Sequence, residues 1–354
     1  MKRISVLTLY PIGVAPGARF RYEQYLNMLS TSNKISIYPF FSAFIYSKVH
    51  GKSFLIRLLM PLAVVLGYCK RFVEVISCLK SDYVYVYREI TPFGPPVFEW
   101  ILAKVFKAKL IFDFDDAIWI SDEKNPLKLW LRNASKTNRI LSLSYKVTVG
   151  NQYLANYARK FNSNVIVIPT TIDTEGLHNS IKEQHTSKLV IGWTGSHSTL
   201  KYLNEFAEVV AILEKKYEFD FVVICNENPN YSLKSFRFIP WRKESEIQDL
   251  LSINIGVMPL SNDEWTKGKC GFKALQYMSL GIPTVVSPVG ANNDIVQEGE
   301  NGFFASSTEE WIDKISQLMD SENLRKSIGR SGIETVEQAY SVSANKKKYL
   351  NLFS

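Results

Sequence analysis

Short apolar runs alternate with amphipathic stretches through the first half of the chain. The apolar runs are rich in β-branched and aromatic residues and are bounded by turn-forming residues; they lie at 4–9, 83–87, 110–116, 146–149 and 165–168. Between them, residues 22–30, 97–106 and 152–160 have the spacing of helices that bury one face. Strands that alternate with helices predict a doubly wound parallel sheet of the α/β class.

The second half repeats this pattern. Apolar runs at residues 189–193, 219–225, 236–239, 253–258 and 284–287 predict a second sheet of the same kind. The polar residues 173–187 between the two halves predict a linker. We therefore expect one Rossmann-like domain over 1–172, another over 188–335, and a terminal helix over 336–354. Open α/β sheets bind ligands beyond the carboxyl ends of their strands, so the loops there are the candidate sites.

Residues 265–295 hold the densest combination of signals. Lys267, Lys269 and Lys273 lie just before or within a helical run at 272–280, which a Gly-Ile-Pro break separates from an apolar strand at 284–287. A helix that starts beside a strand end offers free backbone N–H groups and the positive end of its dipole. With lysines added, the place suits a phosphate; an ordinary basic helix in solvent is the alternative.

The same segment resembles a known family. Residues 268–287 read GKCGFKALQYMSLGIPTVVS and resemble the donor-site segment of glycosyltransferase family 4, the large retaining group with the GT-B fold. Members of that family usually carry Glu, seven residues and a second Glu, followed by Ala-Met-Ala-x-Gly-x-Pro. Here Gly268 and Gln276 stand where the two glutamates are expected. The resemblance implies two Rossmann-like domains that face a cleft, with the second domain holding a nucleotide-sugar.

A glycine- and serine-containing loop follows the first strand of the second half. Gly195 permits close backbone approach, and Ser196 is suited to cap the next helix, so a plain strand-to-helix turn is one interpretation. The resemblance implies instead that this loop cradles the donor diphosphate. Lys201 would stand for the family's phosphate-binding lysine, and Lys269 or Lys273 would replace an arginine that the family carries here.

Further donor contacts follow from the resemblance. Gln276 is predicted to bind ribose or sugar hydroxyls, because an amide both donates and accepts hydrogen bonds. The turn at residues 287–294 resembles the family's Gly-Gly-x-Pro-Glu turn, with Asp294 at the acidic position. Gly290, Ala291 and Asn292 are assigned to the donor with it.

Three carboxylates follow the strand at residues 110–116. Strand alternation places Asp113 and Asp115 on one side and Asp116 near the turn. Asp-x-Asp matches the Mn²⁺ or Mg²⁺ site of the other glycosyltransferase fold, GT-A. The family 4 resemblance instead places Asp115 and Asp116 at the acceptor, where one would position or deprotonate a hydroxyl. Solvated acids at a helix start are the third interpretation.

Arginines are the candidate acceptor-binding residues of the first half. Arg19 and Arg21 fall in a predicted flexible loop at residues 10–21, where the resemblance places acceptor contacts. Guanidinium groups suit a phosphate-bearing acceptor, with ordinary surface arginines as the alternative. Arg88 follows the strand at 83–87 and is assigned to the acceptor too, with a local ion pair to Glu89 as its alternative.

The charge is divided unequally. Residues 1–172 hold 23 Lys and Arg against 10 Asp and Glu, whereas residues 173–354 hold 19 against 24. A basic half favours an anionic lipid or a polyanion as a partner. With no recognised nucleic-acid-binding motif, we expect no nucleic acid. The basic amphipathic segment at residues 53–80 suits an anionic membrane surface, with a helix pair in solvent as the alternative.

Cysteine usage and apolar lengths bear on the compartment. No cysteine lies at zinc-site spacing, and Cys69 and Cys225 fall in apolar runs that predict buried thiols. The longest apolar stretch, residues 58–68, is about half of what a bilayer span needs. The N-terminus has no signal-peptide pattern. We expect a cytoplasmic protein, peripheral on the cytoplasmic face of the inner membrane.

Together these features predict a retaining glycosyltransferase of the bacterial cell-surface glycan type. It would move a sugar from a UDP- or GDP-linked donor to a hydroxyl of a surface polysaccharide, such as lipopolysaccharide, or of a lipid-linked glycan. It would need no metal and no cofactor besides the substrate nucleotide-sugar. Lys273 would neutralise the leaving diphosphate. A GT-A-like metal enzyme, a nucleotide-sugar epimerase and a non-catalytic nucleotide-sugar-binding protein remain open as alternatives.

Overall fold

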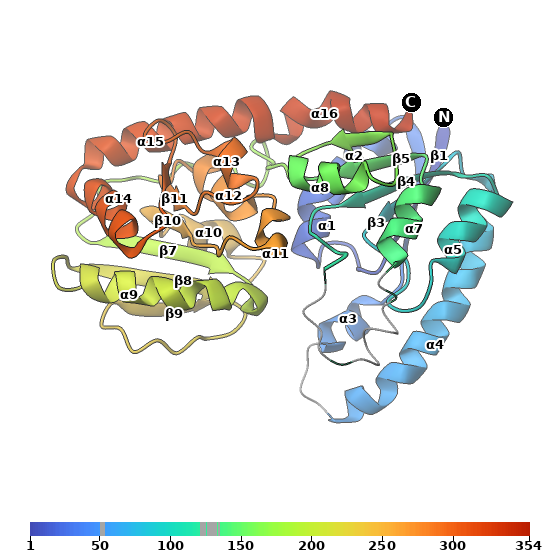
Figure 1. The fold of residues 1–354 in the computed structure, drawn as a ribbon, viewed down its shortest axis with the longest axis horizontal. Helices are drawn as coiled ribbons and strands as arrows, with labels where there is room; N and C mark the ends of the chain where they lie inside the picture. The colour runs from blue at the N-terminus through green and yellow to red at the C-terminus, as the bar shows by residue number, and fades with distance from the viewer. Residues whose placement is uncertain (50–53, 121–124, 126–132, 134) are drawn as a thin grey trace. The chain divides into compact units, whose positions relative to one another are not determined.

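The computed structural model describes residues 1–49, 54–120, 125, 133 and 135–354. The chain divides into two compact units. Figure 1 colours the chain by residue number, from blue at the N-terminus to red at the C-terminus. Unit 1 comprises Met1–Thr170 together with Lys346–Ser354, and unit 2 comprises Thr171–Asn345. Each unit contains one six-stranded sheet in which neighbouring strands run parallel.

The sheet of unit 1 has the strand order β2-β1-β3-β4-β5-β6. Its strands are β1 (Lys2–Thr8), β2 (Asn33–Pro39), β3 (Tyr83–Tyr87), β4 (Lys109–Phe114), β5 (Lys146–Val149) and β6 (Val165–Val167). The chain goes from β1 to one side and then returns to the other side with β3. The strand order therefore reverses between β1 and β3, and the carboxyl ends of these two strands are the expected ligand edge of this unit.

Helices connect these parallel strands. They are α1 (Pro16–Arg21), η1 (Glu23–Tyr25), α2 (Leu26–Ser30), α3 (Ala43–Val49), α4 (Phe54–Ser77), η2 (Cys78–Lys80), α5 (Val97–Trp100), the π-helix η3 (Ile101–Val105), α7 (Lys136–Leu143) and α8 (Gln152–Ala158). No helix in the described part of the chain is long and apolar enough to cross a membrane.

The end of the chain packs on the sheet of unit 1 through aromatic rings. It is formed by α16 (Val342–Leu350) and η6 (Asn351–Phe353). The Tyr349 ring stacks on Tyr25 at 4.0 Å between centroids, and Phe353 packs edge-on against Tyr83 at 5.8 Å. Tyr349 is 1% exposed, whereas Lys346, Lys347 and Lys348 of the same helix are exposed. The helix therefore buries its aromatic side and keeps its lysines in solvent.

The sheet of unit 2 has the order β12-β11-β10-β7-β8-β9. Its strands are β7 (Leu189–Gly195), β8 (Phe219–Cys225), β9 (Phe236–Pro240), β10 (Ile255–Met258), β11 (Thr284–Val286) and β12 (Phe303–Phe304). Its helices are η4 (His197–Tyr202), α9 (Leu203–Leu213), α10 (Glu246–Leu250), α11 (Glu264–Lys267), α12 (Phe272–Ser279), α13 (Asn292–Ile295), α14 (Thr308–Asp320), α15 (Glu322–Thr335) and the π-helix η5 (Val336–Tyr340).

Both faces of this second sheet are covered. Along β8, Phe221 and Val223 belong to a core with α9 and α14, whereas Val222 and Ile224 belong to a core with α10 and α12. Successive side chains of a strand point to opposite faces, so a strand covered on both faces is apolar throughout. This explains why the apolar runs of the sequence are continuous rather than alternating.

The predicted α/β architecture with two parallel sheets is confirmed, but three local predictions are wrong. Residues 10–21 are not all loop, because α1 begins at Pro16, where proline at the first helical position is favourable. The edge strands β2 and β12 were not predicted. Cys69 is exposed on α4 rather than buried, whereas Cys225 is buried as expected.

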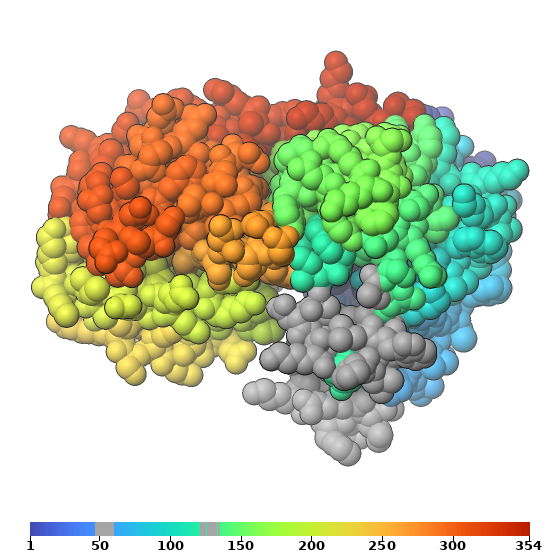
Figure 2. Space-filling model, in the orientation of Figure 1, coloured from blue at the N-terminus to red at the C-terminus, as the bar shows by residue number. Residues whose placement is uncertain are grey.

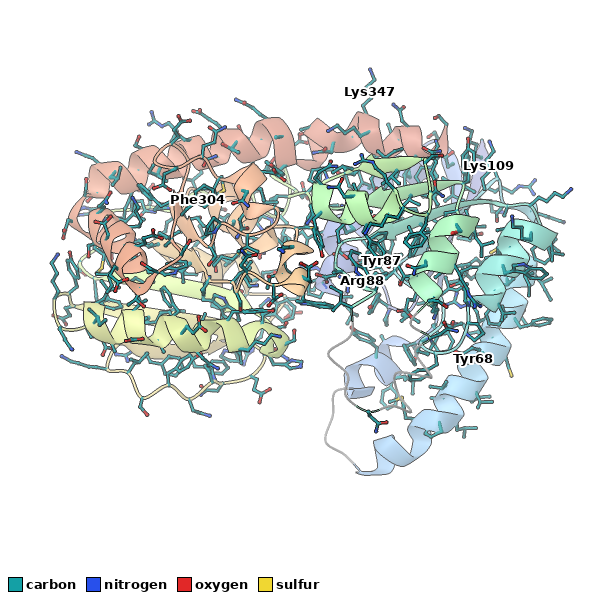
Figure 3. The ribbon with its side chains drawn as sticks, viewed as in Figure 1. Tyr68, Tyr87, Arg88, Lys109, Phe304 and Lys347 are labelled. Carbon is teal, nitrogen blue, oxygen red and sulfur yellow. The ribbon has the colours of Figure 1, made fainter. Side chains whose placement is uncertain are left out.

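Replacing Tyr349 by alanine is expected to destabilise unit 1. The change removes a buried ring that stacks on the buried Tyr25 ring, and such truncations cost about 3–5 kcal/mol of unfolding free energy. Lys347→Ala on the same helix is the matched control, since Figure 3 shows this side chain pointing away from the structure. Urea denaturation followed by circular dichroism measures both. Equal midpoints for the two variants would contradict this packing.

Candidate nucleotide-sugar site

The strand order of unit 2 reverses between β7 and β10. The chain continues from β7 through β8 to β9 on one side and from β10 through β11 to β12 on the other. The loops after the two central strands therefore diverge at their carboxyl ends, Gly195 and Met258. Ligands of open α/β sheets bind at such a reversal. Helix α12 follows β10 along the chain and starts at this edge.

Lys273 of α12 lies against the end of β7. Its Nζ is 5.4 Å from the ring centroid of Trp193, which is itself 1% exposed. A Cβ placed on Gly195 would lie 2.9 Å from Lys273 Cε and 2.4 Å from the Trp193 ring. Only glycine leaves room for both side chains here. Gly195 and Lys273, predicted separately as donor-binding residues, are thus brought together.

Tyr277 holds α12 in this position. Its hydroxyl accepts a hydrogen bond of 2.8 Å from the backbone N–H of Thr194, next to Gly195. Its ring lies over Gly256 of β10, where an added Cβ would come within 2.5 Å of the ring. Burial raises the pKa of Tyr277, so the hydroxyl stays neutral. The tyrosine therefore fixes the helix to both central strands.

The first turn of α12 is electrostatically unusual. Gly271 at the N-cap has φ 67°, and the first turn holds no acidic residue but does hold Lys273. A cation near the positive end of a helix dipole is unfavourable, typically by about 0.3–1 kcal/mol. An anion at the same place would gain from the helix dipole, the backbone N–H groups of the first turn and the lysine together. The arrangement is suited to binding a phosphate or diphosphate.

Lys269 and Lys201 add positive charge in this unit. Lys269 Nζ lies 4.9 Å from the ring centroid of Trp265, and Lys201 Nζ lies 5.1 Å from that of Tyr202. Burial raises the pKa of Tyr202, with Asp263 raising it further and both lysines lowering it. The charges of Asp263, Lys201 and Lys269 are therefore all close enough to affect the Tyr202 hydroxyl. Lys201 and Lys269 share this neighbourhood although they are 68 positions apart in the sequence.

The loop after β7 differs in detail from its prediction. Ser196 occupies the N-cap position of η4, but its side chain makes no capping bond and lies 2.8 Å from the Ser198 hydroxyl. The backbone N–H of His197 donates instead to Asn226 Oδ1 at 2.8 Å. This side-chain acceptor comes from the loop after β8, so the two neighbouring loops are tied together at the carboxyl edge.

Gln276 has an unpredicted partner. Its amide is 2% exposed, and Nε2 donates to Glu246 Oε1 at 3.5 Å. Glu246 begins α10 and is 6% exposed. A carboxylate is therefore brought beside the position where family 4 proteins carry their second glutamate. Nothing in the local sequence around Glu246 signals this, because the two residues are 30 positions apart.

The residues of the 287–294 turn have mainly local contacts. Gly290 has φ 59°, and a Cβ there would lie 2.7 Å from the Lys267 carbonyl oxygen, so the turn packs directly on the end of α11. Asn292 is 1% exposed and donates to the Ser287 carbonyl at 2.9 Å. Ala291 is buried. Asp294 is exposed, and its backbone carbonyl accepts from the Tyr340 hydroxyl at 3.1 Å.

In unit 1, Arg88 joins two of the predicted carboxylates at the carboxyl edge of the sheet. It follows β3 with φ 59° and donates from Nε to Asp115 Oδ1 at 2.8 Å and from Nη2 to Asp116 Oδ2 at 2.5 Å. Tyr87, labelled beside Arg88 in Figure 3, donates its hydroxyl to Asp115 at 2.9 Å. Arg88 thus pairs with these aspartates, and the predicted alternative of a local pair with Glu89 is not what the structure has.

Unlike Arg88, Arg21 makes its contacts in the interior of unit 1. It is 2% exposed, forms an ion pair with Asp113, and donates to the Ile168 carbonyl. The Tyr85 hydroxyl donates to the same carboxylate at 2.6 Å. Burial raises the pKa of Asp113, and Arg21 beside it opposes that rise. The prediction that Arg21 is a loop residue is corrected, because its guanidinium lies in the core on α1.

Arg19 also lies on α1 rather than in a loop. Its side chain is 9% exposed, with the guanidinium carbon 5.0 Å from the Phe20 ring centroid. Its assignment to the acceptor stays a prediction.

Arginine and tyrosine side chains of unit 1 bind both carboxylates of the Asp-x-Asp pair. Asp113 is bound by Arg21 and Tyr85, and Asp115 by Arg88 and Tyr87. Over the described residues, no group of three or more histidines, cysteines and acids is arranged to hold a metal ion. The strand alternation itself is as predicted, since both aspartates face the tyrosines that alternate along β3.

Comparison with known proteins agrees with the geometry of unit 2. Residues 188–321 match a protein-family model described as "Glycosyl transferases group 1". The match lies within unit 2. The matched segment includes the β7–β10 edge, Lys269 and Lys273, so the residues singled out above lie inside it. This match supports the prediction that the protein is a glycosyltransferase.

A curated relative and two solved structures extend the comparison. The chain is 23% identical over 258 residues to the capsular polysaccharide biosynthesis glycosyltransferase CapM of Staphylococcus aureus, a match that covers 69% of this chain and 62% of CapM. Sucrose-phosphate synthase of Thermosynechococcus elongatus superimposes with TM-score 0.73 at 11% identity, covering 100% of this chain and 98% of the other. Anabaena HepE in complex with UDP-glucose superimposes with TM-score 0.69 at 13% identity, covering 99% of this chain and 99% of HepE. The GT-B fold class is confirmed.

Removing the Asp113 carboxylate charge is expected to destabilise unit 1. Asp113→Asn leaves Arg21 buried without its counter-ion, and breaking a buried pair typically costs about 3–5 kcal/mol. Asp116→Asn is the control, because its pair with Arg88 is partly exposed and Arg88 keeps Asp115 as a counter-ion, so a smaller loss is expected. The urea midpoints of the two variants test this. A smaller loss for Asp113→Asn than for the control would refute the structural role.

Proposed function

We propose that this protein is a glycosyltransferase that binds the diphosphate of a nucleotide-sugar at the β7–β10 edge of unit 2. The observation that carries the proposal is the position of Lys273, in the first turn of α12 and against Gly195. The group 1 glycosyltransferase match over the same residues supports it. Lys273 would neutralise charge on the leaving diphosphate, and electrostatic stabilisation of developing charge is usually the largest single contribution to catalysis.

The rest of the donor is assigned around this point. Lys269, Lys201 and Ser196 would contact the phosphates, and Gln276 with Glu246 would contact ribose or sugar hydroxyls. Gly290, Ala291, Asn292 and Asp294 would shape the sugar side of the site. A UDP-linked donor is the first choice because HepE, which shares the fold, has been captured with UDP-glucose; a GDP-linked donor is the alternative.

We assign the acceptor to the carboxyl edge of unit 1. Asp115 and Asp116 are held by one guanidinium, which keeps both carboxylates fixed in orientation. One of them would accept the proton of, or orient, the attacking hydroxyl. The acceptor is proposed to be a surface-polysaccharide or lipid-linked glycan, in line with the capsular polysaccharide role in CapM's name. Retention of configuration and independence of metal are proposed on the resemblance of residues 268–287 to family 4.

Lys273→Ala is expected to weaken donor binding. A charged hydrogen bond is worth about 1.5–3 kcal/mol, so the dissociation constant for UDP or GDP should rise about 10- to 150-fold. Bound donor raises the unfolding temperature by mass action, so thermal-shift titrations of both nucleotide series measure the change. Lys267→Ala is the matched control, because Lys267 is paired with Glu264 at 2.8 Å on the preceding helix. Unchanged binding by Lys273→Ala would refute the phosphate assignment.

Asp116→Asn is expected to lower turnover while leaving donor affinity unchanged. Loss of a general base or orienting group lowers the rate about 10²- to 10⁴-fold. Asp82→Asn is the control, since Asp82 precedes β3 at the opposite edge of the same sheet. Release of free nucleotide with and without acceptor glycans provides the measurement. An equal loss in donor affinity would contradict the assignment of Asp116 to the acceptor.

The same assay separates the alternatives. An epimerase would convert the donor in the absence of acceptor, and a non-catalytic binding protein would bind donor yet release no nucleotide with any acceptor. A metal-dependent enzyme would lose activity with EDTA.

A further inference from the structure

Helix α4 has an apolar surface on the side that it turns to solvent. Its outward positions are large and apolar, namely Leu62, Val65, Leu66, Phe72, Val73 and Ile76, and each is between 45% and 63% exposed. These positions recur at the three- and four-residue spacing that defines one side of a helix. A helix at the surface of a globular protein ordinarily shows polar residues there. The outward side of α4 is therefore built for contact with something other than water.

The inward side of α4 fixes this orientation. Arg71 is fully buried and donates to the backbone carbonyls of Tyr38 at 2.9 Å and Thr8 at 2.8 Å. Gly67 packs on Phe40, where an added Cβ would lie 2.5 Å from the ring. Rotating the helix to bury its outward apolar residues would break these hydrogen bonds and this contact. The exposed apolar residues therefore cannot be hidden by a turn of the helix.

The apolar surface continues beyond α4. Leu79, Phe93, Val97, Trp100 and Val105 are each 37–55% exposed. Tyr68, labelled on α4 in Figure 3, connects the segments, since its hydroxyl donates to the Phe93 carbonyl at 2.5 Å. In Figure 2 the light-blue and cyan atoms of these segments lie at the surface along one margin of the view. We call these residues, with the outward residues of α4, the α4–α5 face.

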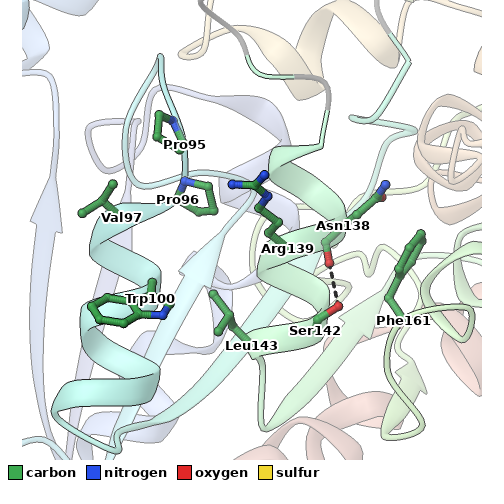
Figure 4. A pocket seen from close by; sticks show the side chains of 9 residues that line it. All are labelled: Pro95, Pro96, Val97, Trp100, Asn138, Arg139, Ser142, Leu143 and Phe161. Carbon is green, nitrogen blue, oxygen red and sulfur yellow. Dashed lines mark hydrogen bonds between the residues drawn. The ribbon is translucent and has the colours of Figure 1, made fainter.

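A groove adjoins this face between α5 and α7. Figure 4 shows its lining, in which Pro95, Pro96, Val97, Trp100 and Leu143 are apolar. Its volume is about 500 Å³. Arg139, which is exposed, lies at the same groove and contributes a positive charge. The α4–α5 face is therefore bordered by a mostly apolar groove.

Along residues 60–109, the segment that carries most of this face, the exposed charges are mostly positive. The exposed lysines of that range are Lys70, Lys80, Lys104, Lys107 and Lys109; of these, Lys70 is paired with Glu74, and Lys109 lies over the Tyr83 and Tyr145 rings. Over the same range Asp82 is the exposed acid, whereas Glu74 and Glu99 are buried. Apolar residues interspersed with lysines suit an anionic lipid surface, in which apolar side chains enter the acyl boundary and lysines meet the headgroups. A second copy of the chain would instead bring like charges together.

We propose that the α4–α5 face docks on the surface of an anionic lipid bilayer. Trp100, half exposed, is the kind of residue that lies at the level of the headgroups. The inference goes beyond the proposed transfer reaction. Binding to lipid requires neither donor nor acceptor, so the outcome of its test is independent of the sugar chemistry.

Co-sedimentation with vesicles tests the proposal on the full chain. Binding is expected with vesicles that mix phosphatidylglycerol and phosphatidylcholine, and at least about tenfold less with phosphatidylcholine alone. The triple change Phe72→Ser, Val73→Ser and Ile76→Ser should lower binding by a further factor of about ten or more, because it removes most of one turn of apolar contact. Leu177→Ser with Ile181→Ser is the control, since both residues are exposed apolar residues of unit 2.

Charge is tested separately. Lys80→Glu with Lys104→Glu should lower binding to the anionic vesicles about tenfold or more, and raising the salt concentration should do the same for the unaltered chain. Equal binding to neutral and anionic vesicles would overturn the proposal. So would an absence of vesicle binding together with a dimer in analytical ultracentrifugation that the triple serine change abolishes, because the face would then belong to a second copy.

Discussion

The position of α12 relative to β7 is the constraint on which the proposed donor site depends. Tyr277 binds the Thr194 backbone and lies over Gly256, which holds the start of the helix at the carboxyl ends of the two central strands. Gly195 leaves the space that Lys273 occupies. A helix start with a lysine and no acid in its first turn is unfavourable by itself and favourable with an anion present. A local arrangement that is unfavourable for stability but favourable for binding a ligand is typical of a functional site.

Unit 1 contains arginine–aspartate ion pairs in two different environments. Arg21 and Asp113 lie in the core and connect α1, β4 and the end of β6. Arg88 holds Asp115 and Asp116 at the carboxyl edge, where the Asp116 side chain is 16% exposed. The first pair is suited to stabilise the sheet, and the second to position carboxylates beside a bound molecule. Burial, rather than residue type, distinguishes the two.

The fold was predictable because its signals are local. Buried parallel strands are continuous apolar runs, and ten of the twelve strands were anticipated from them. The exceptions have physical reasons. Strand β2 is a half-exposed edge strand that ends in proline, and β12 has only two residues. Helix α1 was taken for a loop because glycine and proline surround its start, although proline is favourable there.

The candidate site was predictable only where neighbours in sequence are neighbours in space. Lys269 and Lys273 lie on one continuous segment with the start of α12, so the sequence alone places them together. The partner of Gln276 comes from another helix, and Asp113 lies 92 positions from Arg21. Pairings at such separation depend on the tertiary structure and leave no periodic trace in the sequence.

The central claim is that a diphosphate is recognised by the start of α12 and its lysine. Calorimetric titration with uridine, UMP and UDP, and with the guanosine series, isolates the contribution of each phosphate at constant salt. The account predicts that the diphosphate of the preferred nucleoside binds at least about thirtyfold more tightly than the nucleoside, a gain of about 2 kcal/mol. Equal affinities along both series would contradict it.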